Sequence, residues 1–147
     1  YRAGDCFHKQ NIMDTIFTKI IKGEIPSYKV AEDSLCFAFL DINPNTKGHV
    51  LCVPKIPEDK ILDLPEETFH QLMAFSRKVA LGLREAVPCK RIAISVIGLE
   101  VPHAHVHLIP IEKIEDVTFQ SKISLNSNEM EILAIKISKV PLLTRPP

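Results

Sequence analysis

The stretch Val101-Pro102-His103-Ala104-His105-Val106-His107-Leu108-Ile109-Pro110 carries three of the six histidines of the chain, in strict alternation with small or apolar residues. Alternate side chains of a β-strand point to opposite faces, and neighbours on one face are roughly 6.5–7 Å apart. The pattern therefore predicts a strand with His103, His105 and His107 in a row on one face. The apolar residues between them are expected to enter the core.

Outward from this strand, further apolar runs bounded by turn residues are typical of strands. The expected strands are Tyr28–Ala31, Leu35–Ile42, His49–Val53, Arg91–Ile97 and His103–Ile109. The density of apolar residues in Leu35–Ile42 suits a strand that is buried on both faces. Strands and helices are segregated along the chain, which favours an α+β fold with an antiparallel sheet.

Three helices are predicted beside these strands. Pro65–Val87 has apolar residues at helical spacing, with proline and two acidic residues in its first turn. Asp14–Ile21 suits a short helix that Asp14 caps. A last helix is expected near the C-terminus, where Asn128 and Glu131 stand at the spacing of a capping box.

Length and composition predict one domain, since the chain has 147 residues, is 46% hydrophobic and has a formal net charge of zero. We expect 1–12 to be a disordered leader or expression remnant, 13–139 to be the domain, and 140–147 to be a tail that only a partner orders, if anything does. No apolar run approaches the ~18 residues of a membrane span, and no basic block favours nucleic acid. The four cysteines form no CxxC pair, which favours free thiols in a reducing cytosol.

A row of three imidazoles suits phosphoryl chemistry. A neutral imidazole can attack phosphorus with one ring nitrogen while a hydrogen bond to the other nitrogen fixes its tautomer and orientation. Neighbouring imidazoles can donate to phosphate oxygens or protonate a leaving group. A covalent nucleotidyl-histidine intermediate that water then hydrolyses is a natural outcome of this pattern.

Two other interpretations of the histidines stay open at this point. A His-x-His pair on a strand can present two imidazoles to Zn²⁺, and His49 could supply a third ligand. The histidines could also be structural or exposed, although three in alternation between Pro102 and Pro110 disfavour that.

The segment His103–Ile109 resembles the signature of the histidine-triad (HIT) family, in which three histidines alternate with hydrophobic residues. The blocks Ile16–Pro26, Phe39–Pro44 and Gly48–Lys55 are similar to the N-terminal helix and central strands of that family. The sequence around the triad resembles that of the small bacterial, phosphoramidase-like (Hint-like) branch. The resemblance implies the HIT fold, a five-stranded antiparallel sheet with one long and one or two short helices. It also implies a homodimer whose sheet continues across the two-fold axis.

The resemblance implies a role for each residue of the site. His105 matches the nucleophile, His107 the residue that faces the phosphate oxygens and the leaving group, and His103 the residue that supports the nucleophile from behind. His49 matches a further histidine near the triad, and Asp41 matches the carboxylate that accepts hydrogen bonds from the ribose hydroxyls. The apolar walls of the base pocket are matched by Phe17, Ile20, Ile25, Leu40 and Ile42.

The chain departs from the family in two places. Thr15 and Thr18 occupy the positions of a CxxC pair that helps to bind a structural zinc in many bacterial members, so no such zinc is expected. Before the triad, Ser95 stands roughly where the family often has Asn, and the loop that carries Gly98 and Glu100 is short. Phosphate contacts are therefore expected from backbone amides near Gly98 or from elsewhere.

The activity that the resemblance implies is hydrolysis or transfer at the α-phosphate of purine nucleotide conjugates. The leaving group could be that of a phosphoramidate, an acyl nucleotide or a dinucleoside polyphosphate, and the product AMP or GMP. No cofactor or metal is expected to be required, and the protein is expected to be cytoplasmic. The alternative is a nucleotide-binding or interaction protein with little catalysis.

Overall fold

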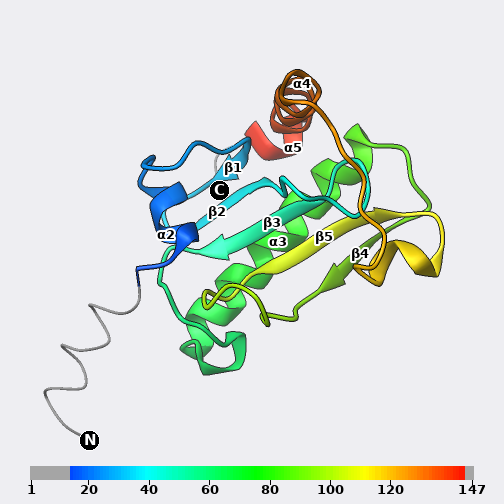
Figure 1. Cartoon of the computed structure of the whole chain (residues 1–147). Helices are drawn as coiled ribbons and strands as arrows, with labels where there is room; N and C mark the ends of the chain where they lie inside the picture. The colour runs from blue at the N-terminus through cyan, green and yellow to red at the C-terminus, as the bar shows by residue number, and fades with distance from the viewer. Residues whose placement is uncertain (1–13, 145–147) are drawn as a thin grey trace, which may run out of the picture.

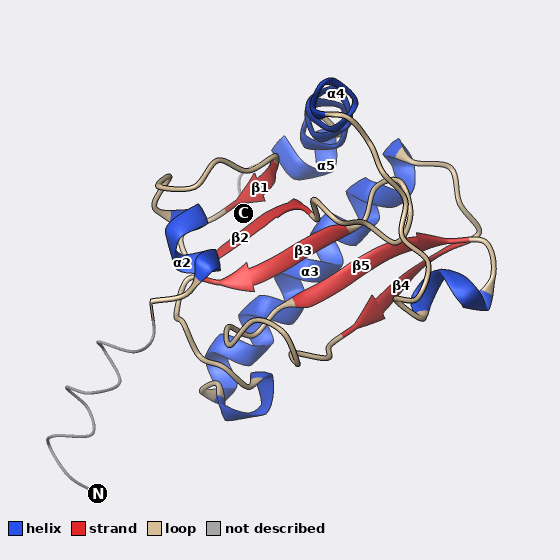
Figure 2. Ribbon diagram, viewed as in Figure 1, coloured by secondary structure: helices blue, strands red, loops and turns tan. Residues whose placement is uncertain are grey.

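The computed structural model describes residues 14–144, which form an antiparallel sheet with helices on both faces (Figures 1 and 2). The strands are β1 (Lys29–Glu32), β2 (Cys36–Leu40), β3 (Val50–Pro54), β4 (Arg91–Ser95) and β5 (Val106–Ile111), and they lie in the order β1-β2-β3-β5-β4. The helices are α2 (Ile16–Ile21), α3 (Glu66–Ala86), α4 (Ser127–Ser138) and α5 (Pro141–Thr144), with short 3-10 turns η1 (Ile61–Asp63) and η2 (Ile114–Val117). The predicted α+β fold with a five-stranded antiparallel sheet is confirmed.

The alternation of β2 produces two hydrophobic layers. Ala38 and Leu40 join the core that faces α3, whereas Phe37 and Phe39 pack with Phe17 of α2 on the opposite face. All residues of β2 are buried, as the apolar run predicts for a strand that is covered on both faces. Figure 1 shows α3 crossing behind the sheet and α2 in front of one end of it.

The triad lies at the start of a strand rather than within it. β5 begins at Val106, so His103 and His105 precede it and only His107 belongs to the ladder. The backbone amide of Ala104 donates instead to the carbonyl of Glu58, at 2.6 Å. The prediction of one strand over all three histidines is therefore wrong, and at Ala104 a contact with a segment distant in the sequence stands in place of a sheet hydrogen bond.

Both short-helix caps differ from the predicted ones. Thr15 rather than Asp14 caps α2, with its hydroxyl accepting from the backbone amide three residues on, at 3.1 Å. Asn126 caps α4 and accepts from the Glu129 amide at 2.8 Å, so the predicted cap Asn128 lies inside the helix. The pairs Asn126–Glu129 and Asn128–Glu131 have the same spacing, so spacing alone does not show which asparagine caps the helix.

The end of the described chain packs on α3. Leu143 of α5 lies so close to Gly82 that a Cβ added there would be 2.8 Å from the Leu143 side chain. Residues 141–144 thus have a packing partner within the chain. The predicted leader 1–12 and residues 145–147 lie outside the described residues. Within residues 14–144, no helix combines the length and the apolar character needed to cross a membrane.

Candidate active site

His105 has one ring nitrogen engaged and one available. Its Nδ1 lies 2.7 Å from the backbone carbonyl oxygen of His103. A carbonyl oxygen only accepts, so Nδ1 carries the proton and the neutral ring keeps its lone pair on Nε2. Within residues 14–144 no hydrogen bond engages that Nε2. Because the residue is only 6% exposed, the lone pair is offered from a position that excludes most water.

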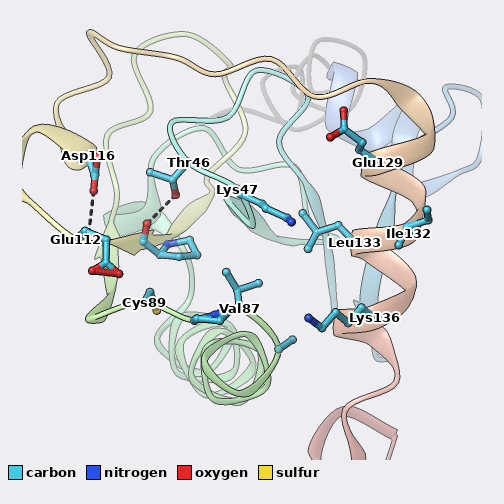
Figure 3. Close-up of a pocket in the computed structure, with 13 residues that line it drawn as sticks. Thr46, Lys47, Val87, Cys89, Glu112, Asp116, Glu129, Ile132, Leu133 and Lys136 are labelled. Atoms are coloured by element: carbon cyan, nitrogen blue, oxygen red, sulfur yellow. Dashed lines mark hydrogen bonds between the residues drawn. The ribbon is translucent and has the colours of Figure 1, made fainter.

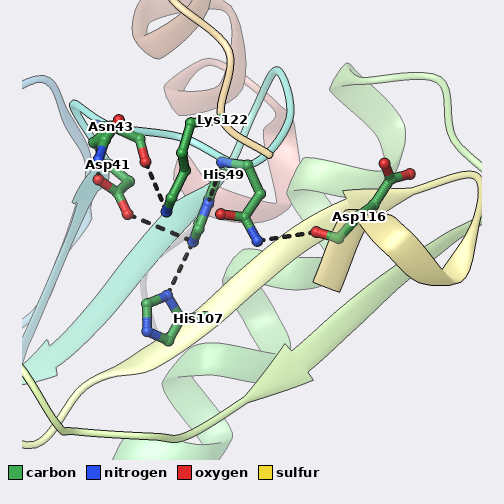
Figure 4. A network of polar contacts seen from close by, with 7 residues as sticks. Asp41, Asn43, His49, His107, Asp116 and Lys122 are labelled. Atoms are coloured by element: carbon green, nitrogen blue, oxygen red, sulfur yellow. Dashed lines mark hydrogen bonds and ion pairs between the residues drawn. The ribbon is translucent and has the colours of Figure 1, made fainter. Parts of the chain in front are cut away.

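His49 fixes the tautomer of His107 (Figure 4). The backbone amide of Asn45 donates to His49 Nδ1 at 3.0 Å, so the neutral His49 carries its proton on Nε2. That nitrogen lies 2.9 Å from His107 Nδ1, which therefore accepts. His107 is left with its own proton on Nε2. His105 and His107, whose ring centroids are 4.9 Å apart, thus offer a lone pair and an N–H donor side by side.

Asp41 stands next to this pair of imidazoles. Its Oδ2 lies 3.6 Å from His49 Nε2, and its Oδ1 accepts from the Asn43 amide at 2.8 Å. Burial raises the pKa of Asp41, while the Asn43 hydrogen bond and the charge of Lys122 oppose that rise. The side chain remains 17% exposed, so its carboxylate can still accept hydrogen bonds from a ligand.

Burial keeps the histidines around His105 uncharged near neutral pH. It lowers the pKa of His49 from the ordinary value of 6.5 to about 3, and that of His107 to about 4. Neighbouring positive charges lower both further. Burial also lowers the pKa of His103. The tautomers that the hydrogen bonds define are therefore the ones present near pH 7.

Asp41, His49 and His107 also form a geometric candidate for a metal site, since one possible ligand atom from each lies within 4.8 Å of the others. A metal ion needs the lone pair of the nitrogen that binds it. His49 Nε2 carries a proton instead, because Nδ1 already accepts from the Asn45 amide. In this hydrogen-bond pattern the three residues form a proton-bearing network, and the set differs from the His-x-His pair with His49 that the sequence left open.

Two predicted site residues lie directly against the triad. Phe17 places its ring centroid 5.1 Å from that of His105 and 5.6 Å from that of His103. Ser95, at the end of β4, is the direct cross-strand neighbour of His107. Residues that face each other across a ladder point to the same side of the sheet, so Ser95 and His107 share one face.

The predicted walls of the base pocket do not all lie together. Ile20 is half-buried beside Phe17, and Ile25 is half-buried after the helix. Leu40 is 1% exposed and belongs to the core that faces α3, on the other side of the sheet from Phe17. Ile42 is 80% exposed. Leu40 therefore supports the sheet from behind, whereas Ile42 is open to contact by a ligand.

The loop before the triad carries the other two predicted residues. Gly98 has φ of +73°, a conformation that glycine adopts without a steric penalty. Glu100 is exposed, and its charge raises the pKa of Asp41, so it lies within electrostatic reach of that carboxylate.

Sequence reasoning missed Phe119 and Lys122, which lie in the segment between η2 and α4. The Phe119 ring centroid is 4.8 Å from that of His107, and the Lys122 ammonium lies 4.7 Å from the Phe119 centroid. Lys122 also donates to the backbone carbonyl of Asn43 at 3.1 Å (Figure 4). No periodicity marks these residues, and only the return of the chain over the β2–β3 turn brings them to the site.

A separate hollow of about 540 Å³ lies between the C-terminal end of α3, α4 and the β2–β3 turn (Figure 3). Lysines, acidic residues and apolar side chains line it together, and none of the site histidines is among its lining residues. The candidate active site is therefore placed by the chemistry of the histidines and not by this hollow.

Residues 22–114 match the sequence pattern of the HIT domain, and this segment contains all three triad histidines together with Asp41 and His49. The chain belongs to the HIT family. Phe119 and Lys122 lie beyond the matched segment, although they contact the site of this HIT protein.

Individual HIT proteins resemble this chain over most of its length. An uncharacterized HIT-like protein of Borreliella burgdorferi is 35% identical over 134 residues, which cover 85% of this chain and 96% of that protein. The adenosine 5'-monophosphoramidase hnt1 of Schizosaccharomyces pombe is 40% identical over 103 residues, covering 67% of this chain and 74% of that protein. The crystal structure of a Hit-like protein involved in cell-cycle regulation from Bartonella henselae superimposes with a TM-score of 0.75 at 31% identity, covering 85% of this chain and 94% of that one.

Proposed function

We propose that this HIT protein is a nucleotide hydrolase that cleaves purine nucleotide conjugates at the α-phosphate through a covalent nucleotidyl-His105 intermediate. The observation that carries the proposal is the hydrogen bond from His105 Nδ1 to the His103 carbonyl. This bond places the proton on Nδ1 and leaves the lone pair of Nε2 free to attack. The relatives named adenosine 5'-monophosphoramidase support a nucleotide phosphoramidate as substrate.

In the first step, the lone pair of His105 Nε2 forms a bond to the α-phosphorus while the bond from phosphorus to the leaving group breaks. The positive charge that develops on the His105 ring is stabilised by the Nδ1–H bond to the His103 carbonyl. The Nε2–H of His107 donates to a phosphoryl oxygen or to the departing atom, where negative charge develops.

In the second step, water attacks the phosphorus and the bond to Nε2 breaks, so the electron pair returns to His105. Water supplies the oxygen of the nucleoside monophosphate and, over both steps, the proton that the leaving group carries away. Asp41 accepts from the ribose hydroxyls, and Phe17, Ile20 and Ile42 contact the base. Ser95, the Gly98 backbone and Glu100 border the phosphate, beside His107 and Asp41.

The protein is further proposed to act as a homodimer in a reducing cytosol, without a metal cofactor. β4 is an edge strand of the sheet and presents Ile94, 53% exposed, next to other exposed apolar residues. An unpaired apolar edge of this kind suits pairing with a second copy. The buried thiols Cys36 and Cys52 are free, which is in keeping with a reducing compartment.

The test is intact-protein mass spectrometry after rapid quenching without acid, with adenosine phosphoramidate and His105→Asn beside the wild type. We expect an adduct of one nucleoside monophosphate and release of AMP, both absent from the variant, with AMP binding retained. The exposed His70→Gln variant of α3 serves as the control. Wild-type protein that binds AMP but forms neither adduct nor product would instead favour the alternative, a nucleotide-binding or interaction protein.

A further inference from the structure

The structure assigns a role to Thr15 that extends beyond capping α2. We propose that Thr15 is a positioning residue for the nucleophile. Its hydroxyl donates to His103 Nδ1 and so fixes the side chain of His103, and the backbone carbonyl of the same residue orients His105. The inference rests on the proposed role of His105 as nucleophile. It concerns a contact between two buried residues that are 88 positions apart in the chain.

The contact is short and shielded from water. Thr15 Oγ1 lies 2.8 Å from His103 Nδ1. Thr15 is 6% exposed and His103 is 0% exposed. A buried hydrogen bond between two side chains costs free energy when either partner is lost, because the remaining polar atom then has no water to replace it.

The direction of this hydrogen bond follows from the other side of the ring. His103 Nε2 lies 2.8 Å from the carbonyl oxygen of Pro54, which can only accept, so Nε2 carries the proton. In a neutral ring Nδ1 then has the lone pair, and the Thr15 hydroxyl must be the donor. The lowering of the His103 pKa by burial is in keeping with the neutral ring.

The first turn of α2 supplies the groups that donate to the oxygen of the same hydroxyl. Thr15 Oγ1 accepts from the Thr18 amide at 3.1 Å, and the two threonine hydroxyls lie 3.1 Å apart. Because the Thr15 proton is directed to His103, the Thr18 hydroxyl donates to Thr15 Oγ1. An ordinary N-cap only has to accept, whereas this cap also has to donate. Asp would satisfy the cap but has no proton to donate, whereas the Thr hydroxyl accepts and donates at the same oxygen.

The consequence reaches the nucleophile through the backbone. The His103 carbonyl accepts from His105 Nδ1 at 2.7 Å, so the orientation of residue 103 sets the direction of His105 Nε2. Phe17, from the same helix, packs against both imidazole rings. A proton added to His103 would also place a positive charge next to the ring that becomes positive during attack, which opposes that step.

Three substitutions separate the two duties of Thr15. Thr15→Ser keeps the cap and the donor. Thr15→Asp keeps the cap acceptor but cannot donate, and its carboxylate favours a second proton on His103, at Nδ1. Thr15→Val removes both functions. Asn126→Asp, which changes the cap of α4 without a contact to the histidines, is the matched control.

The measurements are kcat with adenosine phosphoramidate as a function of pH, the melting temperature, and ¹⁵N NMR of the ring nitrogens in the full chain labelled at histidine. We expect Thr15→Ser and Asn126→Asp to stay within about threefold of wild type. Thr15→Asp should remain folded at the assay temperature, yet lose up to about 10²-fold in kcat at neutral pH, the scale of a misplaced reacting group. Its activity should recover at higher pH, where His103 loses the added proton.

The outcomes distinguish this inference from the proposed function. Normal kcat and an unchanged pH profile in Thr15→Asp, with wild-type turnover intact, would overturn the positioning role and leave only a cap. If the wild type itself has no turnover, the proposed function fails and the NMR measurement decides the hydrogen bond. An unprotonated His103 Nδ1 that becomes protonated in Thr15→Asp supports it, and a protonated Nδ1 in the wild type contradicts it.

Discussion

The two ends of the triad are both anchored by buried hydrogen bonds, but their anchors come from different parts of the chain. His107 rests on His49, which the backbone of the β2–β3 turn holds, and Phe119 covers it. His103 rests on Thr15 of the N-terminal helix and on the Pro54 carbonyl. His103 and His107 thereby carry their protons on Nε2, whereas His105 carries its proton on Nδ1. His105 is therefore the ring of the triad whose Nε2 has a free lone pair.

Of the two ends, the His107 end carries the larger expected effect on activity. His107→Leu removes the N–H that donates to developing negative charge, and loss of one such donor lowers kcat by about 10²–10³-fold. Binding of AMP should change little, because the hydrogen bond strengthens mainly in the transition state. Steady-state kinetics with adenosine phosphoramidate and calorimetric titration with AMP would show the split. A loss of less than tenfold would mean that His107 is not the donor and that the phosphate depends on the loop around Gly98.

How far the sequence predicts this arrangement differs between the two ends. The alternation of histidines predicted that His103, His105 and His107 lie close together, because a motif keeps its local order in any fold. The family resemblance added Asp41, and the structure brings it next to the histidines. Neither could show that β5 starts only at Val106, since the Ala104 amide bonds to a segment that is distant in the sequence. The strands of the sheet were predictable, because the alternation of apolar and polar residues along a strand is a local pattern.

The remaining residues of the site depend on contacts between distant segments. Thr15 was read only as the place of a missing zinc ligand, although the same position lets its hydroxyl reach His103. Leu40 was placed in the base pocket, but alternation along β2 turns it towards α3. Phe119 carried no signal, because its place over His107 depends on anchoring contacts such as that from Ile123 to the Pro44 carbonyl, 3.0 Å long.

Acid should weaken the His107 end more than the His103 end. The pKa is about 3 for His49 and about 4 for His107 in the folded protein, against 6.5 for an ordinary histidine. As the pH falls from 6.5 towards 4, the unfolded state binds more protons. The free energy of unfolding therefore falls by about 1.4 kcal/mol per pH unit for each such group. His103 adds a third group of the same sign, and the raised pKa of Asp41 acts in the opposite direction.

Urea unfolding at pH 7, 6 and 5 measures this dependence. His49→Gln should remove about one group from the slope, whereas the exposed His70→Gln should leave it unchanged. A wild-type stability that does not change between pH 6 and 5 would show that these rings accept protons within the folded state, and the tautomer argument for His107 would then not hold.

The smallest expected effect concerns the backbone that carries Phe119 to the His107 end. Phe119 has φ of 64°, in the left-handed region, where a β-carbon costs about 1–2 kcal/mol. Phe119→Gly and Phe119→Ala both remove the ring from His107 and Lys122, so their difference isolates the backbone. Glycine loses about 0.4–1 kcal/mol through its freer unfolded chain, which leaves it about 0.5–1 kcal/mol more stable than alanine in urea unfolding. Equal stability of the two would mean that the segment relaxes to negative φ once the ring is gone. The edge-to-face contact with His107 would then be what holds the left-handed turn in place.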